Sequence, residues 1–207
     1  MHSETGPSRP LEDHRQTLTF VVLAGGRSSR FGANKLMTDV AGKPLLTLVL
    51  AAIPQGFPTV IAGSSFEAQA MDLKGAIVVA ESPSHGGPLA GLLAAADHIR
   101  TPGVVVVGGD MPNVVPGALQ LASRFDPEAP GALVATDPRG KPQPLCAVFP
   151  AHVLRRAGVV LGSGRDLPLR ALLDLVRPKW VPLPDHMLSD IDRPKDLDRL
   201  RATVAEG

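Results

Sequence analysis

Three features of the sequence predict an α/β fold, a three-layer Rossmann-like sandwich with a mostly parallel central sheet. Short runs are apolar on successive residues, as in strands that are buried on both faces. Segments of helical period separate these runs, as parallel strands require. The chain has 207 residues, 44% of them hydrophobic, which suffices for a sizeable core without disulfide or metal support.

Apolar runs predict strands at residues 18–23, 59–62, 76–79, 104–107, 132–136 and 145–149. Helical periodicity predicts helices at residues 44–53, 66–73, 89–99, 114–124, 151–161, 167–176 and 194–204. The uncharged stretch 44–66 is long enough to be mistaken for a membrane span. Pro54, Gly56 and Pro58 interrupt it, however, so we expect a helix, a turn and a strand there.

Composition and charge exclude several classes of protein. Residues 1–17 are polar and lack the apolar core of a secretory signal, so we expect a disordered tail followed by a single domain over 18–207. The expected location is the cytoplasm, with no membrane association. A single cysteine excludes a disulfide framework and a zinc site with several cysteine ligands. A net charge of +1 and 3% aromatic residues argue against nucleic acid as a partner.

The loop after the first predicted strand is rich in glycine and basic residues. Gly25 and Gly26 allow positive φ and a close approach of the backbone, and Arg27, Arg30 and Lys35 follow. Exposed N–H groups in such a loop can cradle phosphate oxygens. The spacing matches neither the P-loop nor the G-x-G-x-x-G pattern. By composition alone, the loop is either a phosphate site or an ordinary tight turn.

A longer pattern in this loop is more specific. The segment Leu23-Ala24-Gly25-Gly26 is followed by Ser28, Arg30, Gly32 and Lys35. It resembles the L-A-G-G-x-S-x-R-x-G-x-x-K signature of nucleotidyltransferases, which transfer NMP from an NTP to a phosphate. The resemblance implies that the backbone at residues 23–26 holds the triphosphate, while Arg30 and Lys35 bind phosphate charge and act in catalysis. Lys43, in a following G-K-P-L segment, is better explained as a solvated helix start.

A second loop carries a carboxylate at the end of a buried strand. Residues 104–107 run into Gly108-Gly109-Asp110-Met111-Pro112. Magnesium prefers one or two carboxylates together with substrate phosphates. In the family that Leu23–Lys35 resembles, a G/C-D-x-P motif provides the Mg²⁺ ligand, which falls here on Asp110 and gives it a catalytic role. The structural alternative for Asp110 is an N-cap for the helix at 114–124.

The segment Gly86-Gly87-Pro88-Leu89-Ala90-Gly91 opens the next helix. The simplest explanation is a loop with proline in the first turn and small residues for tight packing. G-P-L-A-G also resembles the MobA-type molybdenum cofactor guanylyltransferases, a resemblance that spans about residues 17–200. It implies nucleotide contacts at Gly87, Pro88 and Leu89. Glu81 stands near the family's nucleoside-binding acidic residue, with a different side chain and spacing, or is a surface carboxylate.

Two segments of the second half are candidates for binding the acceptor. Gln143 lies in a segment similar to the family's Q/H-P-L-x-A-x-Y/F, where it faces the second substrate or only begins a strand. Asp190 and Asp192 replace asparagines of some family members just before the last helix. They add a metal ligand or cap that helix. Two acidic residues would repel a phosphorylated pterin unless magnesium intervenes.

The resemblance implies a Mg²⁺-dependent enzyme that transfers GMP from GTP to the phosphate of molybdopterin and releases pyrophosphate. Its expected partners are GTP, molybdopterin and molybdoenzymes or other proteins of cofactor biosynthesis. One alternative is an enzyme that uses CTP or another phosphorylated acceptor. The other is a non-catalytic nucleotide-binding accessory protein, which retention of Lys35 and Asp110 disfavours.

Overall fold

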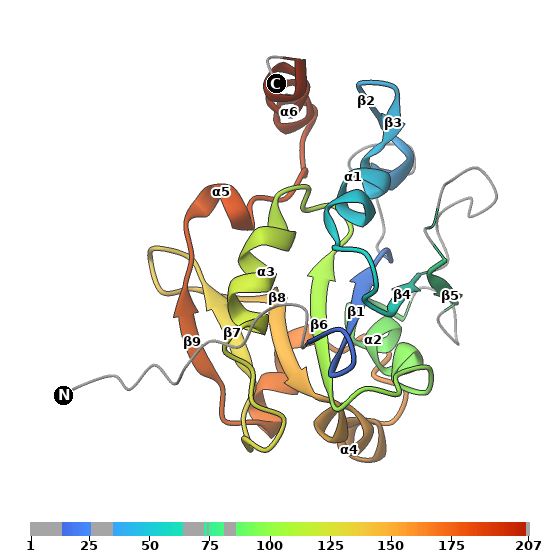
Figure 1. Ribbon diagram of the computed structural model, residues 1–207, viewed down its shortest axis with the longest axis vertical. Coiled ribbons are helices and arrows are strands. Elements are labelled where there is room, and N and C mark those ends of the chain that lie inside the picture. Colours follow the sequence, from blue (N-terminus) through green and yellow to red (C-terminus); the bar gives the residue numbers. More distant parts are fainter. Residues whose placement is uncertain (1–13, 26–34, 64–72, 74, 81–85, 206–207) are drawn as a thin grey trace.

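A computed structural model describes residues 14–25, 35–63, 73, 75–80 and 86–205, and all structural statements refer to these. Seven strands form one sheet in the order β5-β4-β1-β6-β8-β7-β9 (Figure 1). Strand β8 is antiparallel to its neighbours β6 and β7, and every other pair in the sheet is parallel. The strands are, from one edge to the other, β5 Ile77–Val79, β4 Thr59–Ala62, β1 Leu18–Leu23, β6 Gly103–Gly108, β8 Pro142–Pro150, β7 Leu133–Thr136 and β9 Lys179–Pro182. This confirms the predicted fold class.

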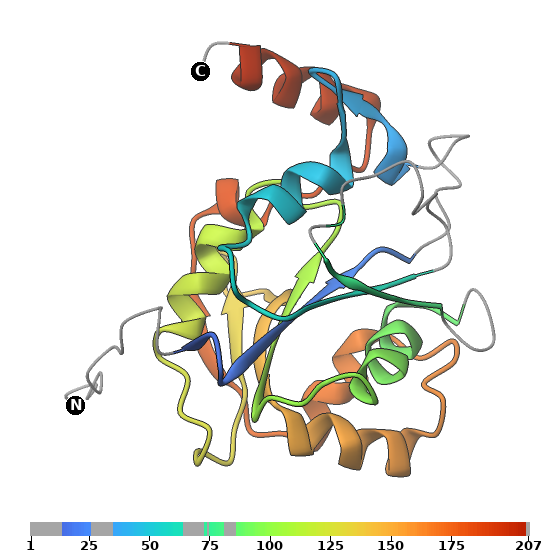
Figure 2. The same cartoon turned by 45° about the vertical axis from the view of Figure 1, so that its right-hand side comes forward.

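Helices cover both faces of the sheet, giving three layers (Figure 2). On one face lie α1 (Leu45–Ala52), α3 (Val114–Ala122) and α5 (Asp185–Leu188). On the other lie α2 (Pro88–Ala96), α4 (Ala151–Leu161) and the 3₁₀ helix η4 (Leu169–Leu175). Every residue of β1 and β6 is buried, which explains why these runs are apolar on successive residues. Each face of the sheet therefore has its own hydrophobic core.

A smaller lobe joins distant parts of the chain. The hairpin of β2 (Asp39–Val40) and β3 (Lys43–Pro44) lies beside the last helix, α6 (Pro194–Ala205), in both views (Figures 1 and 2). Its apolar contacts come from Val40, Leu45, Ile191, Leu197 and Leu200. The guanidinium of Arg201 also donates two hydrogen bonds to the backbone oxygen of Asp39, at 2.8 and 3.2 Å. This lobe brings the chain near residue 192 next to the chain near residue 35.

Most predicted elements are present, with a few differences. All six predicted strands are found, and residues 44–66 contain α1 and β4, as expected. Helix 167–176 is wrong in type, since it forms the 3₁₀ helix η4. The sequence patterns missed four short elements, β2, β3, β9 and α5. Each has at most four residues, which is too few for a periodic signal. The predicted helix 66–73 lies outside the described residues apart from Leu73.

The described residues start at His14, so most of the predicted tail over 1–17 lies outside them. His14 itself is buried. Among the described residues, no helix combines the length and the apolar character needed to cross a membrane.

Candidate active site

The candidate site lies at the edge of the sheet where the parallel strands β1, β4 and β6 end. Leu23 at the end of β1 pairs with Ala62 of β4 on one side and with Gly108 of β6 on the other. The loops that follow these strands are therefore neighbours. Ligands of open α/β sheets bind in the crevice beyond such strand ends. The order of the strands thus brings the glycine-rich loop next to Asp110.

Backbone contacts hold the first loop in place. The N–H of Ala24 donates to the carbonyl of Ala62 at 2.8 Å, and the N–H of Gly109 donates to the carbonyl of Leu23 at 3.0 Å. The side chains of Leu23 and Ala24 are buried in the two cores, so these residues can offer a ligand only their backbone. Gly25 is the last described residue before Lys35. Gly26 and Arg30, which were predicted to belong to the site, lie outside the described residues.

Gly63, which sequence reasoning missed, packs directly against the backbone of this loop. A Cβ atom at Gly63 would lie 2.5 Å from the carbonyl carbon of Ala24 and 2.7 Å from the nitrogen of Gly25. No side chain fits at that distance, so the loop after β4 and the loop after β1 touch only because residue 63 is glycine. The available signal was a glycine directly after a predicted strand.

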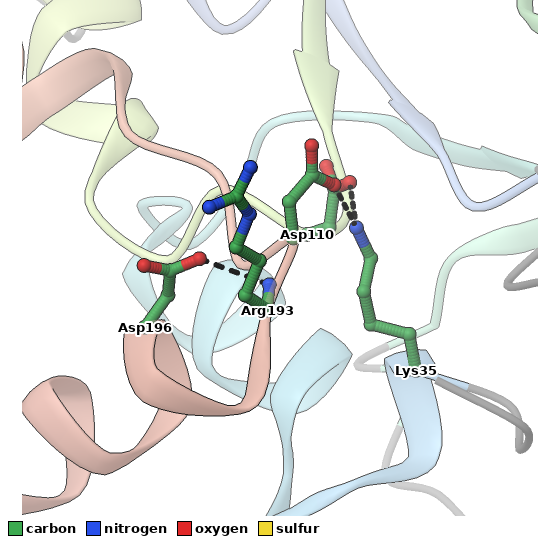
Figure 3. Close-up of polar contacts among 5 residues, drawn as sticks. Lys35, Asp110, Arg193 and Asp196 are labelled. Atoms are coloured by element: carbon green, nitrogen blue, oxygen red, sulfur yellow. Dashed lines mark hydrogen bonds and ion pairs between the residues drawn. The ribbon is translucent and has the colours of Figure 1, made fainter. Parts of the chain in front are cut away.

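Lys35 lies between two carboxylates at the centre of the site (Figure 3). It begins the 3₁₀ helix η2 (Lys35–Met37), and its Nζ is 2.8 Å from Oδ2 of Asp110 and 3.0 Å from Oδ1 of Asp192. The side chain of Lys35 is 13% exposed, that of Asp110 24% and that of Asp192 50%. The structure therefore brings together Lys35 and Asp110, as predicted, and adds Asp192, which lies 157 residues away in sequence.

The carboxylates determine the charge state of Lys35. Burial alone would lower the pKa of its ammonium, but the charges and hydrogen bonds of Asp110 and then Asp192 outweigh that effect and raise it above 10.5. Lys35 is thus held in its charged form throughout the neutral range. A permanently charged ammonium at this position can neutralise carboxylates or phosphate oxygens.

Asp190 adds a third carboxylate to this corner. Ligand oxygens of Asp110, Asp190 and Asp192 lie within 4.8 Å of one another. Although Asp190 is exposed as a residue, its carboxyl is partly shielded from water; this shielding, followed by the charges of Asp192 and Asp110, raises its pKa above 3.8. One lysine therefore faces three carboxylates, an excess of negative charge that a divalent cation would offset. We call these four residues the acidic corner.

The chain before α6 positions Asp192. The N–H of Ile191 donates to the backbone oxygen of Asp110 at 3.0 Å, which ties the two segments together. At the start of α6, the carboxylate of Asp196 accepts from the N–H of Arg193 at 2.9 Å (Figure 3). The residue that caps α6 in this way is Asp196, and Asp192 turns its carboxylate toward Lys35 instead. Two roles were left open for Asp192, a metal ligand or a cap of the last helix, and this geometry favours a place in the site over the cap.

The predicted nucleotide-binding segment at the start of α2 lies at the same edge of the sheet. Strand β5 runs parallel to β4 and leads through residues 80–87 into α2, so the helix begins at the carboxyl ends of the strands. Gly87 has φ +94° and precedes the exposed Pro88, while Leu89 is fully buried. Leu89 can thus contribute only its backbone to ligand binding. Glu81 lies outside the described residues.

Gln143 also lies at this edge. Strand β8 is antiparallel to β6, with Cys146 opposite Val107, so its beginning lies beside the end of β6. Gln143 is only partly buried and is paired with Ala135 of β7. β8 lies between β6, which leads to Asp110, and β7. This position of Gln143 is compatible with the predicted contact to an acceptor.

Comparison with known proteins identifies the family. The model of the MobA-like NTP transferase domain matches residues 20–177, about three quarters of the chain. This chain belongs to that family. A probable molybdenum cofactor guanylyltransferase of Pyrococcus furiosus is 29% identical over 195 residues, 89% of this chain and 97% of that protein. A relative of the same description from Pyrococcus horikoshii is 32% identical over 152 residues, 72% of this chain and 77% of that protein.

Solved structures give the same result for this MobA-like domain. Molybdopterin-guanine dinucleotide biosynthesis protein A of Archaeoglobus fulgidus superposes with a TM-score of 0.70 at 26% identity, covering 91% of this chain and all of that one. The protein is therefore a nucleotidyltransferase similar to molybdenum cofactor guanylyltransferases. The family model ends before Asp190 and Asp192, so the acidic corner is completed by residues beyond the matched region.

Proposed function

We propose that this MobA-like nucleotidyltransferase transfers GMP from GTP to the phosphate of molybdopterin and releases pyrophosphate, in the cytoplasm. The observation that carries the proposal is the meeting of Lys35 and Asp110 at the ends of β1 and β6, beside the glycine loop. The names of the curated relatives support the guanylyl donor and the molybdenum cofactor as acceptor. Molybdoenzymes or other proteins of cofactor biosynthesis would receive the product.

The residues of the acidic corner suit Mg²⁺. Magnesium is a hard cation that takes oxygen ligands, usually one or two carboxylates together with substrate phosphates and water. Asp110 provides one ligand, and Asp192 or Asp190 can provide a second, because their oxygens lie within 4.8 Å of one another. When bound there, the metal would neutralise charge on the triphosphate and polarise the α-phosphorus.

The reaction needs no protein base. A phosphate monoester is already ionised near neutral pH, so its oxygen can attack the α-phosphorus directly while pyrophosphate leaves. What remains for the chain is to position the reactants and to offset their charge. Backbone N–H groups at Gly25 and Gly26 would hold the triphosphate, and Lys35 with Arg30 would bind its oxygens. Lys35 is charged and begins η2, with its ammonium at the centre of the site, as that role requires.

The nucleoside and the acceptor occupy opposite sides of the acidic corner in this proposal. The start of α2, at Gly87 to Leu89, would bind the nucleoside, together with Glu81. Gln143 at the beginning of β8 would face the acceptor. Asp190 and Asp192 would repel the acceptor phosphate unless Lys35 and the metal offset their charge.

The decisive experiment measures incorporation of label from α-labelled GTP and CTP into molybdopterin, with and without Mg²⁺. We expect Mg²⁺-dependent transfer from GTP and pyrophosphate release. Transfer from CTP instead would make the enzyme a cytidylyltransferase. Transfer only to another phosphorylated acceptor would keep the reaction class and change the substrate. GTP binding without any release of pyrophosphate would contradict the proposal in favour of an accessory protein.

A further inference from the structure

A turn that packs against the first half of α2 contacts the predicted nucleoside-binding segment. Residues 162–166 follow the end of α4 in the connection to η4, and we call them the α4–η4 turn. The N–H of Asp166 donates to the carbonyl of Gly86 at 2.8 Å, directly before α2 begins. Gly164, the buried residue of the turn, packs against the first half of α2. The turn thus holds the start of α2 by one hydrogen bond and by one close contact.

The close contact depends on the absence of a side chain at residue 164. A Cβ atom at Gly164 would lie 2.9 Å from Cγ of Leu89, 2.9 Å from Cδ1 of Leu93 and 3.4 Å from the nitrogen of Ala90. Leu89 is fully buried, and Cγ is not the flexible end of its side chain, so it cannot simply swing away. An added methyl group would have to displace α2 or the turn. Gly164 therefore fixes how far the beginning of α2 lies from the α4–η4 turn.

The backbone conformation of the turn accompanies its hydrogen bond to Gly86. Asp166 has φ +58°, a left-handed conformation that residues other than glycine seldom adopt. That conformation persists only where the surroundings fix it. Here it presents the N–H of Asp166 to Gly86. Gly162 and Gly164 also have positive φ, +62° and +68°, but of these two glycines only Gly164 meets α2.

We propose that Gly164 is a positioning residue for nucleotide selection: the α4–η4 turn sets the place of Gly86 to Leu89 and hence the fit of the purine nucleoside. The inference rests on the proposed function, because it assumes that the start of α2 binds the nucleoside. Its effect reaches the ligand through α2, so it does not require the turn to touch GTP. It also separates nucleoside binding from metal binding, because the hydrogen bond and the close contact of the turn go to Gly86 and α2, whereas the carboxylates of the acidic corner lie on the segments after β6 and before α6.

The chain offers a matched pair of variants. Gly164→Ala and Gly162→Ala introduce the same methyl group at nearly the same positive φ, within the same turn. A Cβ atom at Gly162 meets nothing within 4 Å, whereas one at Gly164 meets Leu89 and Leu93. Both variants place an alanine at positive φ, and the ψ of −134° makes Gly162 a strained position for alanine in its own right. A larger effect of Gly164→Ala on GTP binding would therefore come from the contact with α2. Circular dichroism and thermal unfolding establish that each variant is folded.

The readout is the calorimetric dissociation constant of GTP and of CTP with Mg²⁺, which needs no acceptor. For Gly164→Ala we expect GTP binding to weaken about tenfold and the preference for GTP over CTP to shrink, because a small displacement is costly in a fitted site. Gly162→Ala should keep both constants within about twofold of the wild type, as should the Mn²⁺ affinity of either variant measured without nucleotide. Should Gly164→Ala fail to fold, Leu93→Val replaces it and removes one methylene from the same contact.

Equal effects of the two alanine variants on GTP binding would overturn the inference, as would an unchanged GTP constant in folded Gly164→Ala or Leu93→Val. A wild type that binds GTP but transfers nothing contradicts the proposed reaction and leaves this comparison measurable. A wild type that binds no nucleotide contradicts both.

Discussion

The two sides of the candidate site are held by different forces. The acidic corner consists of side chains joined by charge: Lys35 lies 2.8 Å from Asp110 and 3.0 Å from Asp192, and these groups are partly or half exposed. The start of α2 is held by packing, with Leu89 fully buried and Gly164 pressed against it. Charge contacts near solvent respond to pH, salt and cations. Packed contacts respond to the volume of a single methyl group.

This difference suits the two tasks of a nucleotidyltransferase. The acidic corner would have to accept a cation and a triphosphate and then release pyrophosphate, so contacts that exchange partners are an advantage there. Selection of the base instead requires a surface of fixed shape, which packing provides. Substitutions in the corner should therefore change chemistry and metal affinity, and substitutions around α2 and its neighbours should change shape and stability.

The largest effect is expected for Asp110→Asn. The substitution keeps the size of the side chain and removes the charge that both Lys35 and a metal ion would bind. We expect turnover to fall about 100-fold or more, the scale of losing one preorganised electrostatic group. Steady-state pyrophosphate release measures this effect, with thermal unfolding to establish the fold. Turnover equal to that of the wild type in the folded variant would remove Asp110 from the site.

Lys35→Gln should lose less activity, about 30-fold or 2 kcal/mol, and should change metal affinity in the opposite direction. Removing the ammonium leaves Asp110, Asp190 and Asp192 without their counter-charge, so Mn²⁺ should bind more tightly than to the wild type, whereas Asp110→Asn should bind it more weakly. Titration with Mn²⁺ detected by electron paramagnetic resonance provides both values.

The control for Lys35→Gln is Lys179→Gln, at an exposed position where β9 begins, on the opposite edge of the sheet. It should leave turnover and Mn²⁺ affinity unchanged. Weaker Mn²⁺ binding in Lys35→Gln would mean that the lysine does not compete for the carboxylates.

Sequence patterns predicted the parts of this site that are local in the chain. Ala24, Gly25 and Asp110 follow buried strands, and parallel pairing of β1 with β6 is enough to make them neighbours. The partnership of Lys35 with Asp192 was not predictable, because it depends on the packing of α6 against the β2–β3 hairpin. No periodic signal marks so short a hairpin.

The glycines illustrate the same limit. Gly63 and Gly164 stand in loops like many other glycines of the chain, and only the structure shows what a Cβ atom there would touch. A loop glycine indicates a turn from sequence alone, but its neighbours come from segments that are distant in the chain. Gly164 meets α2, and Gly63 meets the loop after β1.

Gly63→Ala tests how far packing also supports the triphosphate loop. The added methyl group would meet the backbone of Ala24 and Gly25 at 2.5 to 2.7 Å, so one of the two loops must move. We expect a loss of about 2 kcal/mol in the free energy of unfolding, typical of overpacking, together with weaker GTP binding. Chemical denaturation and calorimetry measure the two effects.

Gly158→Ala is the control for this substitution, because Gly158 lies within α4 and a Cβ atom there meets nothing within 4 Å. Alanine favours a helix over glycine, so this variant should be as stable as the wild type or more so. A Gly63→Ala protein with undiminished stability would show that the loop after β1 adjusts freely.

The smallest effect is expected for Asp190→Asn, and it depends on pH. The folded state holds the proton of Asp190 more tightly than the unfolded chain does, because shielding from water and the charges of Asp192 and Asp110 raise its pKa above 3.8. The ionised carboxylate is therefore unfavourable above the folded-state pKa, and this penalty fades as the pH falls through that value toward 3.8. At pH 7 without metal, Asp190→Asn should raise the free energy of unfolding by only about 0.5 kcal/mol, since the side chain is exposed and the repulsion is screened.

This gain in stability should shrink as the pH falls. Thermal unfolding across pH measures it, with Asp174→Asn, at an exposed aspartate on η4, as the control. A gain that stays constant with pH, or that Asp174→Asn reproduces, would mean that Asp190 does not share the charge of the acidic corner.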